Sequence, residues 1–241
     1  MTDKATLEAG LARLVADLGG GAAPGCSAVL YGSAARGDWD ARRSDVNLLL
    51  VLEDASPPAL ARLTPAVSDW HERGWTPPLL VSRAEWQRAT DVFPIEITDM
   101  RLSYRVLTGP DPVAALRVDP GDLRRALEQA LRGALVHLRQ AYARFSTAMP
   151  TLGGFASSSS SEVLVLFRAT AVLFGRQPGP SAEAAVSALA DVLGDDAAAV
   201  REIAARRREP EWPCSADLFA GYLGAIARAV DAVDSFQPGV A

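Results

Sequence analysis

The hydrophobic pattern of the chain changes its period near residue 118, and this change limits the folds that the chain can adopt. Before that point, short apolar runs are bounded by Gly, Pro, Ser or Asp, as strands usually are. The predicted strands are Cys26–Tyr31, Val46–Leu52, Leu79–Val81, Phe93–Ile97 and the edge strand Arg105–Leu107. Helices with apolar residues at three- and four-residue steps are predicted before Gly19, at 58–73 and at 84–88. The first half is therefore expected to combine helices with a β-sheet.

After that point, every segment has helical period. Asp119 begins a predicted long helix that reaches about Phe145. The five serines of 157–161 are expected at a helix start, before the apolar run 163–174. Further helices are predicted at 181–193, 196–208 and 215–235. The pattern thus predicts an α+β protein whose second part is an all-α helical bundle. The predicted domains are residues 1–113 and 118–241.

Composition and charge exclude several classes of function. With 49% hydrophobic and 22% charged residues, the chain can bury a core and is not a disordered polymer. Its formal net charge of −5 gives no overall attraction to a polyphosphate backbone, which argues against dedicated nucleic-acid binding. Its two cysteines, Cys26 and Cys214, provide neither a disulfide framework nor a zinc ligand set. The amphipathic N-terminus does not resemble a signal sequence, and no stretch has the roughly 20 apolar residues of a membrane span. We therefore expect a cytoplasmic protein with no membrane partner.

Residues 29–51 carry the pattern that points to chemistry. The apolar strand ends in Gly32 and Ser33 and turns at once into a helix, which exposes backbone N–H groups and a hydroxyl to a phosphate. Asp45 and Asn47 are two residues apart on the next strand, so their side chains are expected on the same face. Two oxygen-bearing side chains then face the ligand that the Gly-Ser turn holds.

This segment resembles the nucleotidyltransferase superfamily, which includes DNA polymerase β, the antibiotic nucleotidyltransferases and the minimal nucleotidyltransferases. The family pattern is Gly-Ser, a spacer, then Asp-x-Asp or Asp-x-Glu on a strand, with a third carboxylate on a later strand. Gly32, Ser33 and Asp45 match it, and the Ala-Arg-Gly and Ser-Asp surroundings match the minimal and antibiotic-modifying members. The resemblance implies a nucleotidyltransferase-type mixed β-sheet with flanking helices in the first domain.

The resemblance also implies a two-metal site for Mg²⁺ or Mn²⁺ with ATP or another nucleoside triphosphate as substrate. Its metal-binding and catalytic residues would be Asp45, Asn47 and Glu96. Glu96 is preferred to Asp99 as the third carboxylate because Ile95 and Ile97 would point inward on a strand. Its nucleotide-binding residues would be Gly32, Ser33, Arg36 and Ser44. Arg36 either reaches a phosphate or pairs with Asp38 or Asp40.

The implied reaction transfers a nucleoside monophosphate, AMP from ATP, to a hydroxyl of a small molecule or a protein, while the helical domain closes over the nucleotide or shapes the acceptor pocket. Asn47 departs from the pattern because an amide supplies no negative charge to a metal, and the loss of one such group costs about 10²–10³ in rate. The alternative is a catalytically silent nucleotide-binding or antitoxin-like interaction protein. Homo-oligomerisation stays open.

A third hypothesis concerns the helical half. Arg132 and His137 have the Arg-x4-His spacing of HEPN ribonucleases, helical proteins that often accompany minimal nucleotidyltransferases. A five-residue step places two side chains about 140° apart around one helix. Ordinary bundle packing is therefore the favoured interpretation of this pair.

Overall fold

The computed structural model describes residues 3–37, 39, 45–209 and 212–237. The chain forms two compact units, and each is described by itself. The first contains the residues up to Phe93 together with Met100–Arg117, and the second contains Pro94–Asp99 together with the residues from Val118 onward. The segment Pro94–Asp99 thus belongs to the second, helical unit, whereas the predicted domain boundary at 113–118 assigned it to the first domain.

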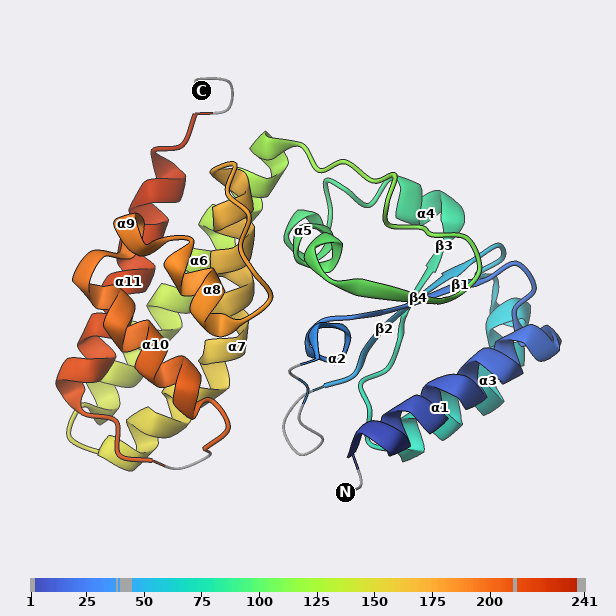
Figure 1. The fold of residues 1–241 in the computed structure, drawn as a ribbon, viewed down its shortest axis with the longest axis horizontal. Coiled ribbons are helices and arrows are strands. Elements are labelled where there is room, and N and C mark those ends of the chain that lie inside the picture. Colours follow the sequence, from blue (N-terminus) through green and yellow to red (C-terminus); the bar gives the residue numbers. More distant parts are fainter. Residues whose placement is uncertain (1–2, 38, 40–44, 210–211, 238–241) are drawn as a thin grey trace. The chain divides into compact units, whose positions relative to one another are not determined.

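The first unit is built on a four-stranded mixed sheet with the order β3-β2-β1-β4 (Figure 1). The strands are β1 (Ser27–Tyr31), β2 (Asn47–Leu52), β3 (Leu79–Ser82) and β4 (Tyr104–Thr108). The central strand β1 is antiparallel to both β2 and β4, whereas β2 and β3 are parallel. Three of the predicted strands and the predicted edge strand are thereby confirmed, as is the α+β class.

Two helices cover one face of this sheet. The helices α1 (Asp3–Asp17) and α3 (Pro57–Glu72) lie together along one side of it (Figure 1). After α1, the glycine-rich turn η1 (Leu18–Ala22) leads to β1, and Gly21 has a φ of 101° there. The shared core contains alternate residues of the strands and one stripe of each helix. Its members include Leu7, Leu11, Leu14, Ala28, Leu30, Val46, Leu48, Leu50, Leu63, Ala66 and Trp70.

The predicted strand at Phe93–Ile97 is wrong, because this segment is the start of helix α5 (Pro94–Leu102). Proline is well accommodated in the first turn of a helix, and the buried residues Pro94, Ile97 and Met100 follow a three-residue step. The alternation of Ile95, Glu96 and Ile97 is compatible with the two-residue period of a strand and also with the period of a helix. The short helix α4 (Arg83–Gln87) precedes α5 and starts at a capping box formed by Ser82 and Glu85.

The second unit is all helical. Its helices are α6 (Pro120–Phe145), α7 (Met149–Leu173), α8 (Ala182–Ser187), α9 (Ala190–Leu193), η2 (Gly194–Asp196), α10 (Ala197–Arg206) and α11 (Ala216–Asp234). As predicted, α6 starts after Asp119, whose side chain accepts hydrogen bonds from the N–H groups of Gly121 and Asp122. The fully buried side chains of Phe167, Phe219 and Tyr222 lie in the core of the bundle.

The five consecutive serines lie inside α7 and not at its start, which corrects the prediction. Ser158, Ser159 and Ser160 each donate a hydrogen bond to the carbonyl three residues earlier. These bonds satisfy the hydroxyls without ending the helix. Helix packing against α6 and α11 then outweighs the low helix propensity of serine.

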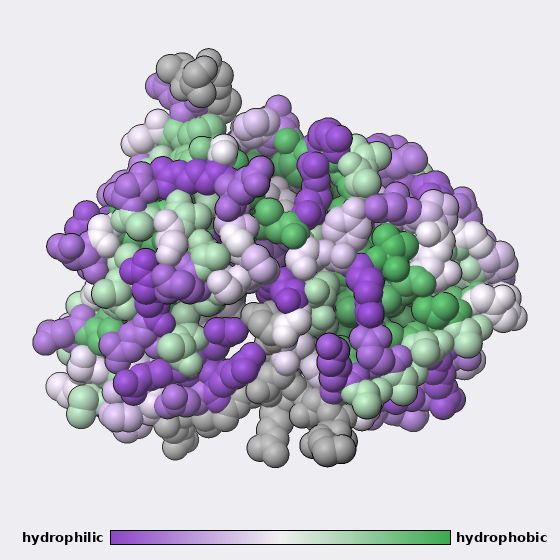
Figure 2. Space-filling view, viewed as in Figure 1, coloured by the Kyte–Doolittle hydropathy of each residue, from purple (hydrophilic) through white to green (hydrophobic). Residues whose placement is uncertain are grey.

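The visible surface carries hydrophilic side chains over much of its area, with hydrophobic residues in smaller patches between them (Figure 2). No helix in the described part of the chain has both the length and the apolar character that a membrane crossing requires.

Candidate functional site

The Gly-Ser turn and Asn47 are in direct contact at one end of the sheet. Gly32 follows β1 with φ 73° and ψ −151°, a conformation that is essentially restricted to glycine. A Cβ placed on Gly32 would lie 2.6 Å from Nδ2 of Asn47. The amide of Asn47 therefore lies against the Gly32 backbone, and glycine is required there for both conformation and space.

The helix that follows the turn is α2 (Ser33–Arg36), a single turn that ends at Gly37 in the left-handed conformation. The N–H groups of Ala35 and Arg36 both donate to the carbonyl of Gly32. Ala34 and Ala35 pack against the core of the first unit, which fixes the turn. Because α2 is so short, its dipole is small, and any anion here would be held mainly by individual N–H groups and side chains.

Asn47 and Asp45 have different environments. Asn47 is the first residue of β2 and is half-buried, and it lies on the face opposite Leu48, which faces α1 and α3. Asp45 precedes the strand and is exposed, while Val46 between them is buried. The structure thus brings Gly32, Asp45 and Asn47 to the same end of the sheet. Arg36 is half-buried at the end of α2, and Ser44, Asp38 and Asp40 lie outside the described residues.

Neither candidate for the third carboxylate lies on a strand. Glu96 is exposed in the first turn of α5 and packs with the second unit, which overturns the reasoning that placed it on a strand beside Asp45. Asp99 is buried in the second unit, where its Oδ1 accepts a hydrogen bond from Nε of Arg168 on α7 at 2.5 Å. This carboxylate already has a charge partner in the helical bundle.

The strand beside β2 presents apolar side chains at the corresponding positions. Leu79 and Val81 of β3 are paired with Leu49 and Val51, so they share the sheet face of Asn47. None of the four strands contains Asp or Glu. The carboxylate that the family pattern places on a later strand is thus absent from β3 and β4.

The donors that the structure describes at this end of the sheet do not fit two metal ions. Asp45 offers one carboxylate and Asn47 one neutral oxygen, whereas magnesium in such sites is bound by carboxylates for their charge. Among the described ranges, no group of three or more His, Cys, Asp or Glu side chains is arranged to hold a metal ion.

Sequence reasoning missed two tyrosines that share a row with Asn47. Tyr31 is the register partner of Asn47 on one side and of Tyr104 on the other. The hydroxyl of Tyr104 donates to Oδ2 of Asp111 at 2.8 Å. Tyr31 directly precedes the Gly-Ser turn, which is a signal in the sequence, but its pairing with Tyr104 depends on a strand register that the sequence does not reveal.

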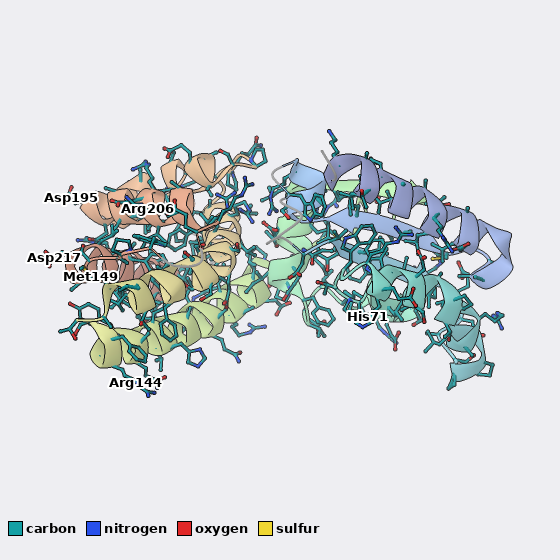
Figure 3. The ribbon with its side chains drawn as sticks, turned by 90° about the horizontal axis from the view of Figure 1, so that it is seen from below. His71, Arg144, Met149, Asp195, Arg206 and Asp217 are labelled. Atoms are coloured by element: carbon teal, nitrogen blue, oxygen red, sulfur yellow. The ribbon has the colours of Figure 1, made fainter. Side chains whose placement is uncertain are left out.

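Other polar residues on the helices take part in ion pairs or are exposed. Arg132 pairs with Glu128 and Asp234 on the surface, and His137 is exposed on the same helix. Arg206 on α10 pairs with Glu202 and lies over the Trp212 ring, and His71 on α3 is exposed (Figure 3).

Comparison with models of known protein families found no family that matches this sequence, and comparison with curated proteins found no match either. The resemblance to nucleotidyltransferases therefore rests on the motif around Gly32, Asp45 and Asn47.

Proposed function

We propose that this chain is a nucleotidyltransferase-fold protein that binds a nucleoside triphosphate, such as ATP, without turning it over. The observation that carries the proposal is the contact between the Gly32 backbone and the Asn47 amide, on a sheet whose neighbouring strand presents Leu79 on the same face. The Gly-Ser turn supports a phosphate site, while the four strands supply no Asp or Glu that could hold a catalytic metal beside Asp45.

The exchange of a carboxylate for an amide changes what the position can bind. A carboxylate repels a bare triphosphate and attracts a cation, whereas the NH₂ group of an amide donates hydrogen bonds to phosphate oxygens. Nδ2 of Asn47 is the atom nearest to the Cβ position of Gly32, so this donor lies beside the turn. The site is therefore suited to a triphosphate that does not depend on a protein-bound metal.

Calorimetric titration of ATP with magnesium and with EDTA tests this directly. The wild-type protein is expected to bind ATP under both conditions, with dissociation constants within about threefold of each other. Asn47→Asp should weaken binding in EDTA by about tenfold, because it adds a charge beside the phosphates, and magnesium should then strengthen it. Gln87→Glu adds the same charge at an exposed position of α4 and should leave both values unchanged. Wild-type binding that disappears in EDTA would contradict the proposal.

The second candidate function is the nucleotidyltransferase reaction itself, and the exposed carboxylate of Asp45 at the end of the sheet that also holds Gly32 favours it. In that case Mg²⁺ or Mn²⁺ would be held by Asp45 together with the phosphates, and AMP would pass to a hydroxyl acceptor. Pyrophosphate release from ATP that Asp45→Ala abolishes would support this candidate and overturn the silent one. ATP binding without pyrophosphate release, in the presence of either metal, is the result we expect.

A further inference from the structure

Three side chains form a row across the sheet next to the Gly-Ser turn. Tyr31 of β1 is directly opposite Asn47 of β2 and Tyr104 of β4, and directly opposite residues project on the same face. Adjacent strands are separated by about 4.8 Å, so the backbone of Tyr104 lies about 10 Å from that of Asn47. The next residue, Arg105, points the other way, because it pairs with Glu8 of α1. The row therefore lies on the sheet face that α1 does not cover.

The ring of Tyr104 is held in a fixed position. Its hydroxyl donates to Oδ2 of Asp111 at 2.8 Å, while Oδ1 of Asp111 accepts from the N–H groups of Val113 at 2.8 Å and Ala114 at 3.1 Å. The hydrogen bond to Asp111 raises the pKa of Tyr104, and burial and the Asp111 charge act in the same direction, against the nearby charge of Arg101. The phenol hydroxyl is thereby used inside the protein, while part of the half-buried Tyr104 side chain stays exposed.

We propose that Tyr104, with Tyr31 beside it, is the platform on which the base of the bound nucleotide stacks. This inference rests on the proposed function, which puts the phosphates at Gly32 and Asn47, one end of the same row. A ring that is already fixed loses little conformational freedom when a base stacks on it. Arg101 is exposed and lies near enough to Tyr104 to act on its hydroxyl, so it adds positive charge for an anionic ligand.

The chemistry of the platform predicts its selectivity. Stacking on an aromatic ring tolerates every base, and preferences follow stacking strength and not hydrogen bonding. Three donors of the protein already use Asp111, which limits what this carboxylate can accept from a base. The ligand class is therefore purine nucleoside triphosphates in general, with ATP and GTP bound about equally and both more tightly than CTP or UTP.

The test compares ATP with inorganic triphosphate by calorimetry in EDTA. Wild-type protein should bind ATP more tightly than triphosphate. Tyr104→Leu keeps an apolar side chain on β4 and removes the ring, and it should weaken ATP binding by about tenfold to a hundredfold while triphosphate binding stays unchanged. Tyr104→Phe keeps the ring and should keep most of the ATP affinity. Val106→Ala shortens a half-buried side chain on the same face of β4 and should leave the ratio of the two affinities unchanged.

Each outcome decides one question. If Tyr104→Leu weakens ATP and triphosphate equally, or weakens neither, the platform is wrong while the phosphate site stands. If wild-type protein binds neither ligand, the proposed function itself fails, and the platform fails with it.

Discussion

Replacing Gly32 by alanine should destabilise the first unit by about 2–6 kcal/mol. The backbone conformation, φ 73° and ψ −151°, costs an L-residue about 1–3 kcal/mol. The new Cβ would lie 2.6 Å from Nδ2 of Asn47, and overpacking of this kind adds about 1–3 kcal/mol. Gly37, at the other end of α2, has φ 85° and ψ 8°, and no described atom lies within 4 Å of the position that its Cβ would take. Gly37→Ala should therefore cost only about 1–2 kcal/mol.

Urea unfolding followed by tryptophan fluorescence measures both values. Four of the five tryptophans lie in the first unit, so a Trp212→Phe background confines the signal to that unit. Asn47→Ala should relieve the overlap but not the backbone strain, and Gly32→Ala should then cost about 1–3 kcal/mol. If Gly32→Ala is no more destabilising than Gly37→Ala, the contact between the turn and Asn47 is wrong. The same result would remove the main support for the phosphate site.

Two substitutions and one labelling experiment test the packing inside each unit. Arg168→Met should lower the stability of the second unit by about 3–5 kcal/mol, because it removes the buried ion pair between Arg168 and Asp99, and thermal unfolding measures this. Gly153→Ala should lower it by about 1–3 kcal/mol in urea, because its Cβ would lie 1.9 Å from the carbonyl oxygen of Trp212. Burial raises the pKa of Cys26 from 9.0 to about 11, so iodoacetamide at pH 8 should label it only slowly, as followed by mass spectrometry.

Each of these three predictions has its own control. Adding Asp99→Asn to Arg168→Met should recover much of the loss, and a loss below about 1 kcal/mol for Arg168→Met alone would contradict the buried pair. Gly133 lies on α6 with open space among the described residues around its Cβ position, and Gly133→Ala should stabilise the protein by about 0.5–1 kcal/mol. Because the folded pKa of Cys26 is raised, its contribution to stability is complete below about pH 9 and is lost as the pH rises toward 11. Rapid labelling of the native thiol at pH 8 would refute its burial.

The elements with strong periodicity were predictable from the sequence. The leucines of α6 repeat at helical steps along a 26-residue helix, and all of them are buried. The strands β1 and β2 are largely apolar and bounded by turn residues, so their type was clear. By contrast, the short segment Phe93–Ile97 offered too few residues to separate a period of two from a period of three or four. Pro94 and packing partners that are distant in the sequence determine that this segment forms a helix and not a strand.

The candidate site, too, was predictable from the sequence only in part. Gly32, Ser33 and Asp45 could be named because the motif is local, whereas the conformation of Gly32 is known only from the structure. The place of Leu79 opposite Leu49 depends on strand pairing between residues far apart in the chain, so the sequence did not show that the neighbour of β2 is a strand without a carboxylate. The partner of Asp99 lies on α7, 69 residues later, and only tertiary packing reveals it.

The phosphate site is tested most directly by an NMR titration of ATP, in EDTA, into ¹⁵N-labelled protein. If Gly32, Ser33 and Asn47 hold the phosphates, the backbone amides of the first two and the side-chain NH₂ of Asn47 shift together, with one dissociation constant. Saturable binding that leaves these three signals in place, or no binding at all, would contradict the proposed site.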